Sequence, residues 1–312
     1  MNTPGENKPT AAAPKTQTHQ QSTAQIWWRA IRPKTLWAAA APVLMGTAMA
    51  FSDGKFHSLA AFCALLGALL IQIGTNFAND YFDFIKGADT EERLGPVRAT
   101  QAGLIAPEAM KKAFILVFIL AFISGIYLIA RGGLPIFIVG IFSILFGILY
   151  TAGPYPLGYN GLGDVFVLIF FGPVAVGGTY YVQALEINNS VLIAGLAPGL
   201  ISTALLAVNN LRDVHTDRAA GKRTLAVRFG IPFTRWEYLL SLLGACALPF
   251  VLIWREDDHY FAVIAAFTLL FALPAIKTVF RESGSPVLNN VLANTGKLLF
   301  IYSVLFSIGW II

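Results

Sequence analysis

Nine apolar segments, each close to 20 residues long, dominate the 312-residue sequence. Their approximate ranges are 35–52, 58–79, 111–130, 133–151, 162–182, 189–209, 235–254, 260–280 and 291–312. About 20 apolar residues in a helix cross the roughly 30 Å of hydrocarbon in a bilayer. Backbone groups in lipid must find their hydrogen bonds internally, and a β-barrel would show alternating segments of about ten residues. The pattern therefore predicts an all-α polytopic membrane protein, a bundle of nine transmembrane helices.

The scarcity of charge agrees with a membrane location. Charged residues make up 12% of the chain, against about 25% in a typical soluble domain. Cys63 and Cys246 both lie inside apolar segments, which excludes a disulfide framework and a cysteine-based metal site. Residues 1–25 contain no apolar run and are rich in Thr, Gln, Pro and Ala. We expect them to form a disordered tail, with the folded domain over residues 26–312.

Lysine and arginine are distributed unevenly between the two ends of the predicted helices. With the N-terminus in the cytoplasm, 18 of the 22 lie on the cytoplasmic side, and three, Lys55, Arg131 and Arg255, lie on the opposite side. Cytoplasmic loops carry such an excess. We therefore expect a multi-pass protein of the cell inner membrane, with a cytoplasmic N-terminus and the C-terminus on the opposite side. The net charge of +5 then reflects orientation and gives no reason to invoke nucleic acid.

A first cluster of amides and acids ends the second apolar segment. It comprises Asn76, Asn79, Asp80, Asp83 and Asp89, with Lys86 among them. Asn79 and Asp83 are four residues apart, so a helix places them on one face. Carboxylates stacked at the end of an apolar helix repel one another unless a cation lies among them. Carboxylate and carboxamide oxygens suit Mg²⁺, which readily shares its coordination with a phosphate.

A second cluster repeats this pattern on the same side of the membrane. Asn210, Asp213 and Asp217 follow a spacing of three and four residues, and Lys222 and Arg223 come next. Asp213 lies 130 residues and four predicted helices after Asp83. This spacing suggests two four-helix pseudo-repeats, with the ninth helix appended.

Acids followed by cations at one mouth of an apolar bundle indicate a particular chemistry. Aspartates would bind Mg²⁺, Mg²⁺ would bridge a diphosphate, and lysine or arginine would bind the remaining phosphate oxygens. The ligand that fits an adjoining apolar bundle is a lipid with a diphosphate head. Its natural reaction is loss of the diphosphate, because metal and cations stabilise the leaving charge.

The two clusters resemble a known family. The stretches N-D-Y-F-D-F-I-K-G-A-D at 79–89 and N-N-L-R-D-V-H-T-D-R-A-A-G-K-R-T at 209–224 are similar to the acidic motifs of the UbiA superfamily of membrane prenyltransferases. R-P-K-T-L at 32–36 and G-P-Y-P-L-G-Y at 153–159 look most like the branch that acts in menaquinone biosynthesis. The resemblance covers about residues 26–312 and implies a central cavity that is capped on the cytoplasmic side.

The resemblance also implies an activity and its participants. The reaction is Mg²⁺-dependent transfer of a polyprenyl chain from polyprenyl diphosphate to 1,4-dihydroxy-2-naphthoate. The ring loses its carboxyl as CO₂, pyrophosphate is released, and demethylmenaquinone is formed. The expected partners are these two substrates and the lipid bilayer, with no obligatory protein partner evident.

Site residues carry over position by position. Asp83, Asp213 and Asp217 are the implied catalytic acids. The implied metal ligands are Asn79, Asp80, Asp83, Asp89, Asp213 and Asp217. Many superfamily members have an acid where this chain has Gly87, so which of Asp80, Asp83 and Asp89 contacts metal stays open. The candidate substrate-binding residues are Asn79, Lys86, Arg98, Asn210, Lys222 and Arg223 for the diphosphate, Arg32 for the naphthoate carboxylate, and Tyr150 for the allylic cation.

Two alternatives are weighed against this interpretation. A secondary transporter would also have repeats and intramembrane polar groups, but its charged site usually lies near the bilayer midplane. The acids here cluster at helix ends on one side, which favours an enzyme. The other alternative keeps the fold and takes another aromatic acceptor, such as 4-hydroxybenzoate; the stretches at 32–36 and 153–159 argue against it.

Overall fold

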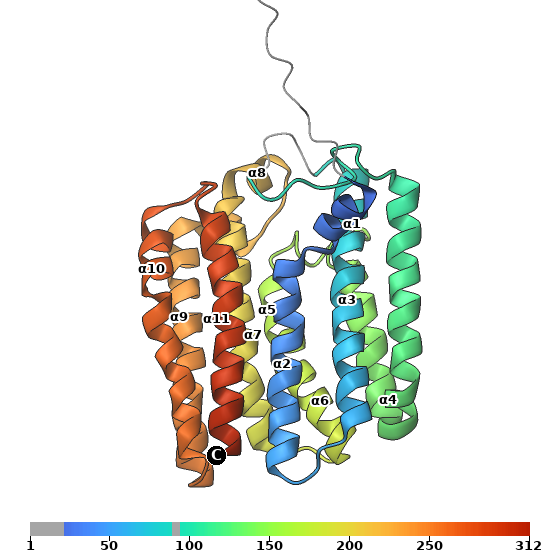
Figure 1. The fold of residues 1–312 in the computed structure, drawn as a ribbon. Helices are drawn as coiled ribbons and strands as arrows, with labels where there is room; N and C mark the ends of the chain where they lie inside the picture. Colours follow the sequence, from blue (N-terminus) through green and yellow to red (C-terminus); the bar gives the residue numbers. More distant parts are fainter. Residues whose placement is uncertain (1–21, 89–93) are drawn as a thin grey trace, which may run out of the picture.

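The computed structural model describes residues 22–88 and 94–312, and the described residues contain helices and no strands. The α-helices are α1 (Thr23–Ile31), α2 (Pro33–Ser52), α3 (Ser58–Ile85), α4 (Pro107–Leu149), α5 (Gly163–Ile169), α6 (Ala175–Ala184), α7 (Asn189–Arg212), α8 (Val214–Ala219), α9 (Leu225–Glu256), α10 (Thr268–Arg281) and α11 (Leu288–Ile311). A π-helical turn, Phe170–Val174, joins α5 to α6, and a 3₁₀-helix, Tyr260–Phe267, leads into α10. The long helices stand side by side as one bundle (Figure 1). The predicted all-α class is confirmed.

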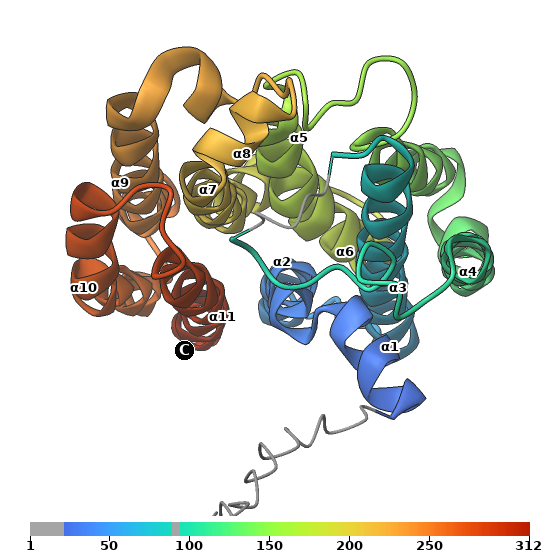
Figure 2. The same cartoon turned by 90° about the horizontal axis from the view of Figure 1, so that it is seen from above.

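Eight helical stretches of the described chain are long and apolar enough to cross a membrane. One of them, α4, has 43 residues, which in a straight helix would extend about 65 Å, twice the hydrocarbon thickness. Its backbone leaves the helical region at Gly133, with φ 68° and ψ −153°. Phe122 before this break and Ile144 after it line the same cavity, so the chain turns back on itself. The predicted segments 111–130 and 133–151 correspond to the two arms of α4 (Figure 2).

Helix α1 lies across the end of the bundle at which α8 is also found (Figure 1). It begins at Thr23, within the last residues of the predicted tail, because Ser22 and Gln25 form a reciprocal capping box. Residues 1–21 of that tail lie outside the described residues. Helix α3 continues to Ile85, six residues beyond the predicted segment, and so carries the first acidic motif on a helix.

The two sides of the bundle are packed differently. Small residues bring the π-helical turn close to α7, since a Cβ built on Gly195 would lie 2.8 Å from the Cα of Pro173. Buried side chains of α2, α7, α9, α10 and α11 form one continuous core. Between α3 and α4 the buried clusters are small. That side of the bundle therefore has room for a cavity.

Candidate active site

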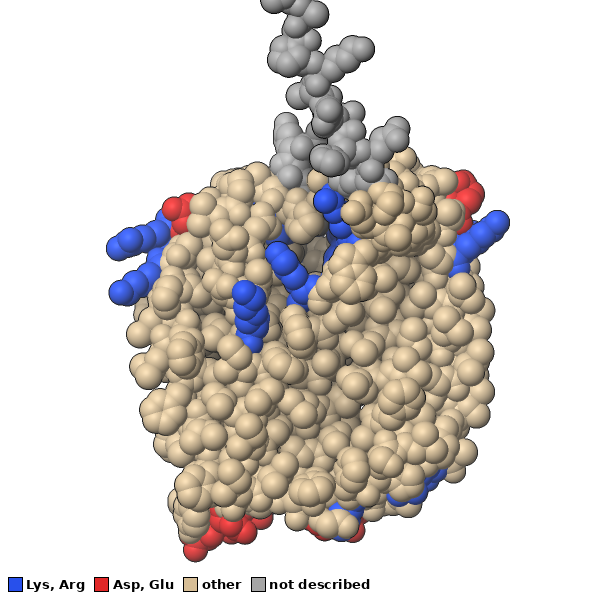
Figure 3. Space-filling model, in the orientation of Figure 1, with Lys and Arg blue, Asp and Glu red and all other residues tan. Residues whose placement is uncertain are grey.

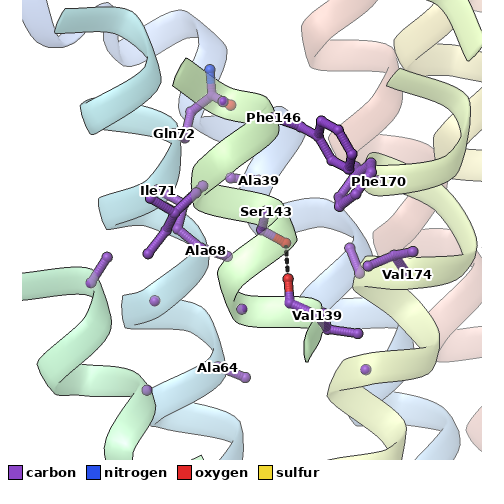
Figure 4. A pocket seen from close by; sticks show the side chains of 18 of the residues that line it. Ala39, Ala64, Ala68, Ile71, Gln72, Val139, Ser143, Phe146, Phe170 and Val174 are labelled. Carbon is purple, nitrogen blue, oxygen red and sulfur yellow. Dashed lines mark hydrogen bonds between the residues drawn. The ribbon is translucent and has the colours of Figure 1, made fainter. Parts of the chain in front are cut away.

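A cavity of about 360 Å³ lies between α2, α3, both arms of α4 and the α5–α6 segment. Its size falls in the range of ligand pockets, about 300–1,000 Å³. Aliphatic and aromatic side chains such as Ile71, Phe146 and Phe170 line most of it (Figure 4). The Ser143 hydroxyl donates a hydrogen bond to the carbonyl of Val139, 2.7 Å away. Its donor is therefore satisfied within the protein and needs no partner on a ligand. This interior suits a hydrocarbon chain.

One end of the cavity is polar and adjoins the first motif. Gln72, Asn76, Asn79 and Tyr150 all line it. Asn79 lies one helical turn before Asp83 and accepts a hydrogen bond from the Thr151 hydroxyl at 2.9 Å. The motif on α3 is thereby joined to the loop that follows α4. A ligand with its chain in the cavity would place its head beside Asn79 and Asp83.

Asp83 is the most strongly engaged acid of the first motif. It is buried, and its carboxylate accepts hydrogen bonds from Arg98 Nη2 at 2.9 Å and from the Tyr159 hydroxyl at 2.5 Å. Because the arginine is buried as well, the pair forms a charge-assisted contact shielded from water. Two loops that are distant in sequence therefore meet at one carboxylate.

Asp80 has a different role in the same motif. Its two carboxylate oxygens accept the backbone N–H groups of Ala99 and Thr100, each at 3.1 Å. It is only 2% exposed. Asp80 therefore anchors the loop that carries Arg98 and sets the position of that arginine opposite Asp83.

In the second motif, Asp213 is held by its neighbour in sequence. Arg212 donates from Nε to Oδ1 at 2.8 Å and from Nη2 to Oδ2 at 2.5 Å. Arg212 is 2% exposed and also donates to the side chains of Asn209 and Asn289. Asn289 in turn donates to the carbonyl of Leu94, at 2.8 Å. This network links the second motif to α11 and to the loop after the first motif.

Tyr159 brings the two motifs together. While its hydroxyl donates to Asp83, its ring lies 4.8 Å from the ammonium of Lys222 and 5.2 Å from that of Lys86. Lys222 pairs with Asp217 at 3.2 Å. The acids of α3 and α8 thus face one another across one tyrosine, with two lysines on its ring.

Lys86 closes the site on the side of the first motif. Its ammonium donates to the carbonyls of Thr151 and Gly153, at 2.7 and 2.9 Å. Burial lowers the pKa of Lys86, while the Asp83 carboxylate acts in the opposite direction. The lysine therefore holds the loop after α4 in place and can exchange its neutral carbonyl partners for an anion.

The described residues also include Arg223, Arg32 and Asn210, which were predicted to bind substrate. Arg223 is exposed, and its backbone N–H donates to the Tyr159 carbonyl at 2.6 Å. Arg32 joins α1 to α2 in a left-handed conformation, with φ 56°. Asn210 is buried on α7. Asp89 lies outside the described residues.

Three residues of the site were not predicted from the sequence to have a functional role: Tyr159, Arg212 and Asn289. Tyr159 closes the G-P-Y-P-L-G-Y stretch and Arg212 lies within the second acidic motif, so a signal was present for both. A tyrosine in a loop, or an arginine beside an aspartate, is common in proteins and does not by itself indicate a functional role. Nothing in the sequence around Asn289 indicates its contact with Arg212, which lies 77 residues earlier.

The acids are paired with cations and do not form a ready metal cage. Over residues 22–88 and 94–312, no three acidic, histidine or cysteine side chains are grouped closely enough to hold a metal ion. Mg²⁺ commonly takes one or two carboxylates together with water and substrate phosphates. Asp83 and Asp217, facing across Tyr159, fit that requirement when the metal comes with a diphosphate.

Comparison with known proteins gives consistent matches. The model of the UbiA prenyltransferase family matches residues 39–309. A 1,4-dihydroxy-2-naphthoate octaprenyltransferase of Haemophilus influenzae is 39% identical over 92% of this chain and 96% of its own. The protein of the same description in Escherichia coli is 38% identical over 94% of this chain and 97% of its own.

Solved structures agree on the fold. A UbiA homologue from Archaeoglobus fulgidus, bound to DMAPP and Mg²⁺, has a TM-score of 0.63 to this chain. The match covers 90% of this chain and 99% of that one, at 16% sequence identity. At this identity the likeness is evidence for the shared helical architecture alone.

Proposed function

The chain belongs to the UbiA prenyltransferase family, and from this premise we propose that it transfers a polyprenyl chain from polyprenyl diphosphate to 1,4-dihydroxy-2-naphthoate. The naphthoate specificity is supported by relatives of that description, 38–39% identical over more than nine-tenths of the chain. The observation that carries the proposal is the meeting of Asp83 and Asp217 across Tyr159, at the polar end of an apolar cavity. The product is demethylmenaquinol, the quinol form of demethylmenaquinone, which places the enzyme in menaquinone biosynthesis.

The diphosphate head is assigned to the space around Tyr159. Asp83 and Asp217, with Asn79, would hold Mg²⁺, which when bound neutralises phosphate charge and stabilises the leaving pyrophosphate. Asp213 is already bound in bidentate fashion by Arg212, so we assign it to positioning the second motif. Lys86, Lys222 and Arg98 can turn from their present partners to phosphate oxygens.

The cavity holds the prenyl chain and keeps water from the reacting carbon. Breaking the allylic C–O bond leaves positive charge on the chain, which the ring of Tyr150 at the polar end of the cavity can face. In the net reaction a bond from the naphthoate ring to the allylic carbon replaces the bond to the carboxyl carbon. CO₂ leaves, its bonding electron pair returns to the ring, and no proton is consumed.

The product identifies the acceptor. Purified protein in nanodiscs, given octaprenyl diphosphate, Mg²⁺ and carboxyl-labelled 1,4-dihydroxy-2-naphthoate, is expected to release labelled CO₂ in step with the prenylated quinol. 4-Hydroxybenzoate at the same concentration serves as the alternative acceptor. Faster prenylation of 4-hydroxybenzoate would contradict the naphthoate assignment. Uptake of either compound into sealed proteoliposomes without a product would indicate a transporter.

Nine membrane crossings follow if each arm of α4 crosses once, giving two four-helix halves with α11 appended. We place α1, α8 and the acidic motifs on the cytoplasmic side of the inner membrane, since the lysine and arginine excess lies there. The end of α11 lies at the opposite end of the bundle from α8 (Figure 1).

A fusion reporter tests this topology. A reporter inserted after Gly95 is expected to report a cytoplasmic location, and one fused after Ile312 a periplasmic location. The same location at both positions would contradict the nine crossings, and the opposite location at both would contradict the orientation.

Tyr159→Phe tests the contact that joins the motifs. The variant keeps the ring beside both lysines but loses the hydrogen bond to Asp83. A hydrogen bond to a charged group contributes about 1.5–3 kcal/mol, so we expect kcat/KM for the prenyl diphosphate to fall about 10- to 100-fold. Tyr155→Phe is the control, because Tyr155 is an exposed tyrosine of the same loop. Equal rates in the two variants would contradict the assignment.

A further inference from the structure

Two lysines lie at the same level where α2 meets α11, outside the candidate active site. A Cβ built on Gly296 would lie 3.5 Å from the carbonyl oxygen of Lys34, so Lys34 and Lys297 are at the same level. Both are exposed. One turn deeper on each helix is an aromatic residue, and the rings of Trp37 and Phe300 are 4.5 Å apart. We name these four residues the lysine seam.

The lysine seam carries charge that none of the described residues neutralises. Lys297 lies nine residues after the start of α11, which is about 13 Å along the helix. A lysine below the helix end is costly in lipid unless it is paired or reaches a headgroup. In the part of the chain that the structure describes, neither ammonium contacts a carboxylate or a hydrogen-bond acceptor. Helices α1, α2 and α11 contain no Asp or Glu.

The surface view shows the same imbalance. On the face where α2 and α11 run, a group of Lys and Arg side chains surrounds a shallow hollow in the upper part (Figure 3). The acidic side chains, together with other Lys and Arg, lie at the upper corners and the lower edge. Between the central basic group and the lower edge the surface is uncharged. Positive charge above an apolar surface matches a lipid with an anionic head.

We propose that the lysine seam binds the phosphate headgroup of an anionic phospholipid, whose acyl chain lies against Trp37 and Phe300. Basic groups between transmembrane helices bind such headgroups. Neither the two lysines nor the two aromatic residues line the cavity assigned to the prenyl chain. The lipid site is therefore separate from the substrate site.

A bound lipid would bridge two helices that both lead to the active site. Asn76 of α3 donates to the carbonyl of Ile31, just before α2, at 2.9 Å. At the start of α11, Asn289 accepts from Arg212. A lipid bound to both helices would hold these two hydrogen-bonded contacts in place. We therefore expect lipid binding to stabilise the protein as well.

Lipid retention by native mass spectrometry tests the site on the whole chain, without turnover. Wild-type protein titrated with phosphatidylglycerol is expected to bind it in preference to phosphatidylcholine and to unfold at a higher temperature when it is present. The double variant Lys34→Gln/Lys297→Gln should lose about 10- to 30-fold in apparent affinity for phosphatidylglycerol. Lys111→Gln/Lys112→Gln, which removes two exposed lysines at the start of α4, is the matched control and should behave as wild type.

Equal retention of phosphatidylglycerol by the two double variants would overturn the proposal, and so would equal binding of the two lipids by wild type. An increased KM for naphthoate in Lys34→Gln/Lys297→Gln, with lipid retention unchanged, would assign the lysine seam to the acceptor carboxylate and also overturn it. Because lipid binding is measured without substrates, the result does not depend on the proposed reaction.

Discussion

Replacing Asp83 with asparagine is expected to lower kcat for prenyl transfer about 10³-fold, the upper end of what one stabilising group at a developing charge contributes. The substitution keeps the shape of the side chain and removes the charge that Arg98 and the proposed Mg²⁺ both require. The rate is measured as CO₂ release at saturating substrates and Mg²⁺. The protein should still insert in the membrane, since Asp83 lies at the end of α3, after the apolar run.

Glu108→Gln is the control for this loss of charge. Glu108 is exposed in the first turn of α4, on the same side of the bundle, and its replacement should leave kcat unchanged. A rate for Asp83→Asn within about threefold of wild type would show that Asp83 is outside the reaction centre. That result would leave the prenyl transfer assignment standing and remove the proposed metal site.

Replacing Arg212 with alanine is expected to destabilise the protein by about 3–5 kcal/mol, the usual result of breaking a buried ion pair from one side. Asp213 would lose its bidentate partner, and Asn209 and Asn289 would each lose a donor. The effect is measured as a lower unfolding temperature of the purified protein in nanodiscs. Arg212→Lys should recover only part of it, since a lysine cannot make the planar two-point contact.

The double variant Arg212→Ala/Asp213→Ala separates the ion pair from general packing. With both charges removed, no unpaired carboxylate stays buried, so the double variant should be less destabilised than the sum of the two single variants. Strict additivity would indicate that Arg212 stabilises the bundle independently of Asp213, through Asn209, Asn289 and packing.

The membrane class and the position of the acids could be predicted from the sequence for physical reasons. Apolar runs of membrane length leave the chain few alternatives to helices, and the spacing of Asn79 and Asp83 places them on one face wherever a helix continues. The residue at which α3 ends, beyond the first acidic motif, was harder to predict. Asp80 and Asp83 interrupt the apolar run with charge, but both find partners that let α3 continue to Ile85.

The partners of these acids could not be predicted, because they depend on how loops pack. The pairing of Asp83 with Tyr159 joins residues 76 positions apart, and the contact between Arg212 and Asn289 needs the start of α11 to lie over the end of α7. By contrast, the two helices predicted at 111–130 and 133–151 are present as the two arms of α4. The chain turns back between them at Gly133, where a glycine can adopt a positive φ.

The central claim is that the two acidic motifs form one Mg²⁺-dependent diphosphate site, and binding of a non-reactive prenyl thiodiphosphate measures it directly. Wild-type protein in nanodiscs is expected to bind this analogue with Mg²⁺ and to lose it when the metal is chelated. Asp83→Asn and Asp217→Asn should each weaken the Mg²⁺-dependent binding by at least about tenfold, a loss of about 1.4 kcal/mol. Binding that is unchanged by chelation, or retained at full affinity by either variant, would contradict a shared site.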